Sequence, residues 1–167
     1  MASEIPGSAN PFTILKQEHA VIDRLFQSHQ EMLLDRSWAK ALRLLEHYQQ
    51  LLESHIEFED SILLPDCITD SIEPVRWKAR VYLAEHRGVE ELVNEARTRL
   101  VTIRRRGIKS SMLIELLDQE RTVKHVLEHH HEREEKGIYD ELYRKLSAGE
   151  RQNLIATLSE SSAHHIH

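Results

Sequence analysis

The chain has few of the residues that interrupt helices, with five glycines and four prolines among 167 residues. Aromatic residues make up only 5% of it, whereas charged residues make up 30%. Leucine, glutamate, arginine, lysine and alanine, which favour helices, therefore fill long uninterrupted stretches. This composition predicts an all-α protein, and the length suits a single domain with one sizeable core.

Three further scarcities exclude whole classes of protein. Cys67 is the only cysteine, so an internal disulfide is impossible. No apolar run approaches the roughly 20 residues that span a bilayer, and the first residues lack the apolar core of a signal peptide. The formal charge of -6 argues against a general nucleic-acid binder. We therefore expect a cytoplasmic protein that binds neither nucleic acid nor membrane.

Apolar residues recur at helical spacing in four long segments, residues 12–34, 37–63, 71–107 and 111–146. Ser37 is a plausible N-cap for the second segment, and Pro65 stops it. Joining loops of under about ten residues imply antiparallel neighbours, and hence an antiparallel up-down-up-down four-helix bundle.

A short extra C-terminal helix should follow the bundle, because Ser147 and Glu150 match a capping box ahead of an amphipathic segment, Leu154 to Leu158. We divide the chain into a flexible arm (1–11), the bundle (12–160) and a flexible, histidine-containing tail (161–167). The tail histidines lie beyond the last amphipathic segment and should only bind nickel or zinc adventitiously.

The two halves repeat one pattern: a histidine, then, on the next predicted helix, a histidine followed four residues later by a glutamate. The residues are His19, His55 and Glu59 in the first half and His86, His130 and Glu134 in the second. Residues four apart share a helix face, so each His-x3-Glu presents a nitrogen and an oxygen to the same point. Two paired hairpins would bring both sets to one centre, and we predict a metal site there.

A single His-x3-Glu is a weak signal, because glutamate is common in this chain. Carboxylates, however, are almost never fully buried unless they are paired or bound to metal, and two occupy predicted core positions. The alternative is a glutamate-rich bundle in which these positions face water and the histidines are incidental. We assign that interpretation to His29, His47 and His125.

The fourth helix leaves a choice of register. By periodicity alone, His131-x3-Glu135 fits the apolar stripe about as well as His130-x3-Glu134. The repeat favours the second pair, because Glu135 then aligns with Asp60 of the first half without a gap. Whether His131 or Glu135 also enters the site stays open.

Three neighbours of the proposed ligands allow two interpretations. Asp23 and Glu90, each four residues after a proposed ligand histidine, either orient its imidazole or form exposed ion pairs. Tyr82, one turn before His86, is interpreted as a core residue rather than a redox participant.

Mixed imidazole and carboxylate ligands in a helical bundle suit iron or manganese, whereas a closed structural zinc site uses four ligands and usually cysteine. Six ligands exceed the need of one tetrahedral ion. If Glu59 and Glu134 each bridge two ions, each metal receives two imidazole nitrogens and two carboxylate oxygens. A shared oxo or hydroxo group would leave one open position per metal for O2, NO or peroxide.

The chain resembles a hemerythrin-like protein of the His-His-Glu (HHE) cation-binding family over about residues 12–146. The resemblance rests on EH at 18 and 85, HIEFEDSILLP at 55–65 and HHEREEKGIYDEL at 130–142. It implies two non-haem iron ions in an oxo- or hydroxo-bridged centre, held by the six residues above with both glutamates bridging. The family's dedicated oxygen carriers have His-x3-His on the third helix, where this chain has Glu90, and the fourth helix has Asp140 in place of the signature proline. The first departure argues against reversible O2 carriage.

We therefore expect a non-haem di-iron protein that binds O2 or a related small ligand (NO, peroxide) for sensing, storage or delivery, and favour a metal- and O2-binding protein over an enzyme. The alternatives are a di-iron oxidoreductase that reduces peroxide, O2 or NO, and an iron storage or iron-centre repair protein. Haem binding through paired histidines is a further alternative. A sensor would also need a protein partner, which the sequence does not identify.

Overall fold

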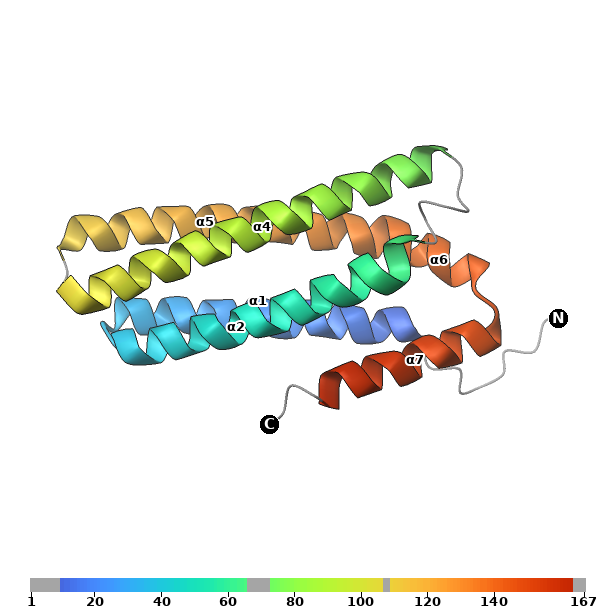
Figure 1. The fold of residues 1–167 in the computed structure, drawn as a ribbon, viewed down its shortest axis with the longest axis horizontal. Helices are drawn as coiled ribbons and strands as arrows, with labels where there is room; N and C mark the ends of the chain where they lie inside the picture. The colour runs from blue at the N-terminus through green and yellow to red at the C-terminus, as the bar shows by residue number, and fades with distance from the viewer. Residues whose placement is uncertain (1–9, 66–72, 107–108, 164–167) are drawn as a thin grey trace.

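The computed structural model describes residues 10–65, 73–106 and 109–163. Most of them form four long helices, α1 (Pro11–Leu34), α2 (Trp38–Phe58), α4 (Glu73–Arg106) and α5 (Ser110–Arg133). Short π-helical segments continue α2 and α5, namely η1 (Glu59–Leu63) and η2 (Glu134–Ile138), followed by α6 (Tyr139–Lys145) and α7 (Ala148–Ala163). The long helices lie alongside one another, and α7 packs against α1 (Figure 1). The prediction of an all-helical bundle is confirmed for these residues.

Local sequence sets the boundaries of the first two helices. Pro11 begins α1, where its fixed φ suits the first helical position, and the Asn10 side chain accepts a hydrogen bond from the Phe12 N–H (3.0 Å). The turn after α1 places Arg36 at φ 58°. Ser37 is the N-cap residue of α2, as predicted, although its side chain makes no capping hydrogen bond. This tight turn sets α2 beside α1.

The capping box predicted before the last helix is confirmed. The Ser147 N–H donates to Glu150 Oε2 (2.7 Å), and the Glu150 N–H donates to Ser147 Oγ (3.3 Å). The helix that follows extends to Ala163 and is longer than the predicted segment. The predicted N-terminal arm up to residue 9, the predicted ends of the third helix at Ser71 and Gly107, and the last four residues of the tail lie outside the described residues.

A polar layer divides the apolar core into two clusters. Ile22 and Phe26 of α1 belong to the cluster nearer the α1–α2 turn, whereas Phe12 and Leu15 belong to the cluster nearer α7. His19 lies between these two pairs, and the remaining predicted ligands lie on the other helices where one cluster gives way to the other, with Ile56 and Phe58 on either side of the change in the second helix. Because apolar burial stabilises by about 25 cal/mol per Å², both clusters hold the polar layer in place. No described helix is long and apolar enough to cross a membrane.

Candidate metal centre

All six predicted ligands are buried and gather in the polar layer, with no more than 4% of any of them exposed. Their candidate ligand atoms, together with one from His131, form two groups in which all atoms lie within 4.8 Å of one another. One group comprises His19, His55, His131 and Glu134, and the other comprises Glu59, His86, His130 and Glu134. Glu134 is common to both, so the two groups are adjacent.

The four predicted histidines point their Nε2 atoms inward in two pairs. Nε2 of His19 lies 2.9 Å from Nε2 of His55, and Nε2 of His86 lies 2.7 Å from Nε2 of His130. Each pair combines the two helices of one half of the chain, as the repeat predicted. Two imidazole nitrogens are thus available to a metal on each side of the layer.

Each glutamate lies between a histidine of one half and a histidine of the other. The two oxygens of Glu134 lie 2.9 Å from Nε2 of His130 and 3.6 Å from Nε2 of His19. Oε2 of Glu59 lies 3.4 Å from Nε2 of His86 and 3.5 Å from Nε2 of the histidine one turn earlier on its own helix. A carboxylate in this position can reach two ions.

Four more carboxylates hold the outer nitrogens of the same rings. The pairs with the Nδ1 atoms are Glu18 with His55 (2.9 Å), Asp60 with His86 (2.6 Å), Glu85 with His130 (2.7 Å) and Glu135 with His19 (2.8 Å). A histidine that donates from Nδ1 to a carboxylate has its tautomer and ring orientation fixed for binding metal through Nε2. Each of these four carboxylates directly precedes or follows a proposed ligand in the sequence, and the ring that it holds belongs to a different helix.

The hypothesis that Asp23 and Glu90 orient the imidazoles is therefore wrong. Each lies one helical turn beyond its histidine, and Asp23 is exposed. The carboxylate that faces Nδ1 comes from the adjacent helix, because the rings point across the bundle rather than along their own helix.

The donor set passes a test for metal binding that is independent of the sequence pattern. Oε2 of Glu59 and Oε2 of Glu134 are buried and have no hydrogen-bond partner. A buried polar atom without a partner costs roughly 1–3 kcal/mol, whereas a cation between the carboxylates and the imidazoles would satisfy both. Nitrogen and carboxylate oxygen donors without sulfur fit iron or manganese.

Protonation differs from ring to ring. Burial favours the neutral form of His86, but the hydrogen bond with Asp60 and the nearby carboxylates of both site glutamates raise its pKa to about 11. Burial acts in the same sense on His55, where the charge of Glu59 and further carboxylate contacts raise the pKa. Burial, and then the charge of His55, lower the pKa of His19. Metal binding must therefore displace a proton from His86.

Both site glutamates begin a π-helical segment, which the sequence analysis missed. The Leu64 N–H donates to the carbonyl of Glu59, and the Tyr139 N–H donates to the carbonyl of Glu134, five residues apart in each case. Single π turns inside α-helices occur frequently at functional sites. Apolar periodicity does not reveal these π segments, because the apolar stripe of each helix resumes one turn after the glutamate.

Two buried residues at the site break the repeat. The His131 ring stacks on that of His19 at 3.6 Å, and burial, followed by the charge of His55, lowers the pKa of His131 to about 3. The Tyr139 hydroxyl donates to Glu59 Oε1 (2.5 Å) and lies 3.2 Å from Nε2 of His19. Ile56 and Leu64 occupy the matching positions in the first half, so the two sides of the layer differ chemically.

His29 is not incidental, and the expectation that it faces water is wrong. It is fully buried, with Nε2 2.7 Å from Glu120 Oε1 and Nδ1 2.8 Å from the carbonyl oxygen of Ala41. Its place on the stripe with Phe26 and Leu33 was a signal of burial. His47 and His125 are exposed, as expected. Tyr82 is buried, as predicted, with its ring edge-to-face with that of His130 at 5.3 Å.

Comparison with known proteins bears on the first half of the site. The hemerythrin HHE cation binding domain matches residues 1–67, a span that contains His19, His55 and Glu59. No curated protein and no solved structure matches the chain. The resemblance seen in the sequence is confirmed over this span, and the chain is therefore similar to the hemerythrin HHE cation binding domain through residues 1–67.

Proposed function

We propose that this hemerythrin-like protein is a non-haem di-iron protein that binds O2 or a related small ligand, NO or peroxide, for sensing, storage or delivery. The observation that carries the proposal is the position of Glu59 and Glu134, each buried between histidines of both halves with one oxygen unpartnered. In this proposal residues 12–160 form one antiparallel up-down-up-down bundle. Its ligands are the six residues predicted from the sequence, with both glutamates bridging.

The chain's own groups have separable roles. Four imidazole nitrogens and two carboxylates bind the ions, and the four outer carboxylates fix the rings so that Nε2 faces inward. The apolar clusters above and below the layer limit access by water, which strengthens electrostatic interactions inside it. Bound iron would supply the redox-active electrons and open positions for a diatomic ligand or peroxide.

A second candidate, a di-iron oxidoreductase acting on peroxide, O2 or NO, is favoured by Tyr139. Burial, and then the charge of Glu59, raise the pKa of this phenol well above its usual range. The hydroxyl therefore keeps its proton at neutral pH, next to Glu59 and His19. A proton held there is available to a ligand that is being reduced.

Metal content per chain tests the proposal, measured after anaerobic loading with ferrous iron in a background where His164, His165 and His167 are glutamine. We expect about two irons in this protein and loss of most of them in His55→Ala and His130→Ala, because each removes one of the two inward-facing imidazole nitrogens of its pair. His47→Ala, an exposed histidine, is the control. Equal metal content in all of these proteins would refute the proposed centre.

The visible spectrum as air is admitted separates the candidate functions. A new band that disappears on deoxygenation supports reversible O2 binding. Irreversible oxidation together with turnover of peroxide, O2 or NO supports the oxidoreductase. Iron that leaves readily to a chelator supports storage or repair of iron centres.

A further inference from the structure

Two pockets open beside the polar layer, and their charges differ. The smaller, with a volume of about 370 Å³, is lined by residues of α1, α5 and η2 and reaches His19 and His131 directly. We call it the acidic opening, because its charged lining residues are Asp23, Glu128, Glu132, Glu135, Lys16 and Lys136. Four carboxylates against two lysines give its wall an excess of negative charge.

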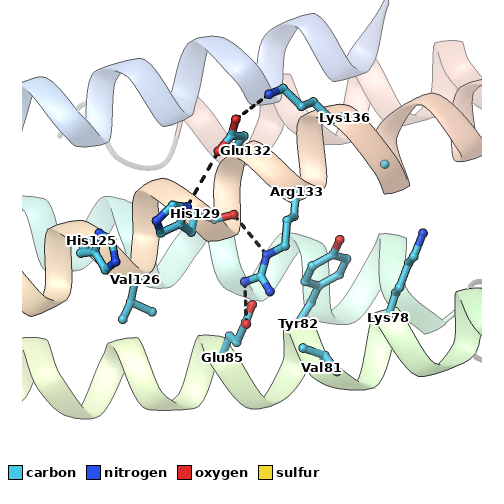
Figure 2. Close-up of a pocket in the computed structure, with 11 residues that line it drawn as sticks. Lys78, Val81, Tyr82, Glu85, His125, Val126, His129, Glu132, Arg133 and Lys136 are labelled. Atoms are coloured by element: carbon cyan, nitrogen blue, oxygen red, sulfur yellow. Dashed lines mark hydrogen bonds and ion pairs between the residues drawn. The ribbon is translucent and has the colours of Figure 1, made fainter.

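The larger pocket, of about 740 Å³, has the opposite balance (Figure 2). Lys78, Arg133 and Lys136 line it together with only two carboxylates, Glu85 and Glu132. The guanidinium of Arg133 lies 2.6 Å from Glu85. This pocket reaches groups behind His130 but none of the proposed ligands. A cation approaching the layer therefore meets a favourable field at the acidic opening rather than here.

His131 connects the acidic opening with the site. It is 95% buried, since its relative exposure is 5%, and its Nδ1 has no hydrogen-bond partner. One of its ring nitrogens lies within 4.8 Å of candidate ligand atoms of His19, His55 and Glu134. An unpartnered buried imidazole that lines a pocket and also reaches the ligands is placed to bind a cation on its way inward.

Asp23 and Glu128 lie at the outer part of the same opening. Both side chains are exposed, so a hydrated ion can reach them without any movement of the bundle. Loss of solvent around its carboxyl group, and then the charge of Glu128, raise the pKa of Asp23. The two carboxylates thus repel one another, and an arriving cation relieves that repulsion.

We propose that the acidic opening is the route by which a divalent cation reaches the buried centre, with Asp23 and Glu128 attracting the ion and His131 transferring it to His19. This inference rests on the proposed function, because it requires a metal site at the inner end of the route. It gives Asp23 and His131 a role in the uptake of the ion, whereas the six proposed ligands hold the ion once it is bound.

The test is the rate at which metal-free full-length protein takes up Co2+, followed by the visible absorption of the bound ion in stopped flow at low ionic strength. The three tail histidines are replaced by glutamine in every protein. We expect Asp23→Asn/Glu128→Gln to slow uptake by about fivefold or more, with the same final cobalt content, because electrostatic steering changes rates by 10-fold to 1000-fold in favourable cases. Added salt should slow the parent protein more than this variant.

His131→Phe tests the transfer step, since it keeps a ring against His19 but removes both nitrogens. We expect it to slow uptake as well. The matched control is Glu115→Gln/Asp118→Asn. It also removes two negative charges, but from exposed positions of α5 outside the acidic opening. His125→Gln/His129→Gln removes the imidazoles of the larger pocket. Neither control should change the rate.

The outcomes separate this inference from the proposed function. Normal uptake by Asp23→Asn/Glu128→Gln, or equal slowing in either control, overturns the route and leaves the metal centre intact. Normal uptake by His131→Phe overturns the role of His131. Failure of the parent protein to bind cobalt or iron at all overturns the metal centre and the route with it.

Discussion

The buried pair of His29 and Glu120 gives the sharpest prediction about stability. Both side chains are fully buried, and they join α1 to α5 while the second ring nitrogen of His29 holds the carbonyl of Ala41 in α2. His29 lies about 15 Å along α1 from His19, at about 1.5 Å per residue. Changes to the pair should therefore alter stability without altering metal content.

The size of the effect follows from the burial. Replacing Glu120 by leucine leaves Nε2 of His29 buried without its hydrogen-bond partner, and leaving a buried polar group without a partner costs roughly 1–3 kcal/mol. That is a large share of the roughly 5–15 kcal/mol that stabilises a domain of this kind. The double variant His29→Leu/Glu120→Leu should recover most of the loss, because neither side chain is left buried without the other. Glu120→Gln keeps a hydrogen-bond partner for His29 and should cost less than Glu120→Leu.

Urea unfolding of the metal-free protein, followed by circular dichroism in the presence of a chelator, measures these free energies. Glu46→Gln is the control, because Glu46 and Arg97 form an exposed pair (side chains 38% and 43% exposed) that is worth less than about 1 kcal/mol. A loss below about 1 kcal/mol in Glu120→Leu would refute the reasoning. So would a double variant whose loss equals the sum of the two single losses, since buried partners should be strongly coupled.

Two predictions concern the metal centre itself. Glu85→Gln should lower the affinity for ferrous iron by about 10-fold to 100-fold, measured by competition with a chelator, because it weakens the hold on Nδ1 of His130. The control is Glu90→Gln, which changes a carboxylate one turn after His86 that does not hold the ring. It should leave the affinity unchanged. Metal affinity should rise with pH between 6 and 9, by up to about tenfold per unit for each displaced proton, because the pKa of His86 is raised to about 11 and metal must displace its proton. The same shift stabilises the metal-free fold most below the ordinary imidazole pKa of 6.5 and is lost as pH rises through 11. A metal affinity that is independent of pH would contradict the predicted displacement of a proton from His86.

Apolar periodicity predicted the helices and the burial of the six proposed ligands, because both follow from local spacing. It did not predict the carboxylates that hold the rings. Glu18 and Glu85 each precede a proposed ligand in the sequence, but each faces a histidine of the neighbouring helix. Which helix face meets which is a property of tertiary packing, and a single sequence does not encode it in a short pattern.

The two adjacent histidines of α5 show a second limit. Periodicity treated His130 and His131 as alternatives, yet both are buried. Neighbouring residues are about 100° apart around a helix. At the polar layer, the buried face of α5 is wide enough to include both of these side chains. His29 was misjudged for a related reason, since its partner Glu120 lies 91 residues away in the sequence.

The π turns at Glu59 and Glu134 also show how closely the two halves of the chain match. A π turn adds one residue to a helix, and such turns are frequent at functional sites. Here the insertion stands at matching positions of both halves, immediately after the same histidine spacing. The two halves therefore share a backbone irregularity as well as a pattern of proposed ligands. The halves differ at His131 and Tyr139, where the first half has Ile56 and Leu64, so only the second half supplies an extra imidazole and a phenol to the polar layer.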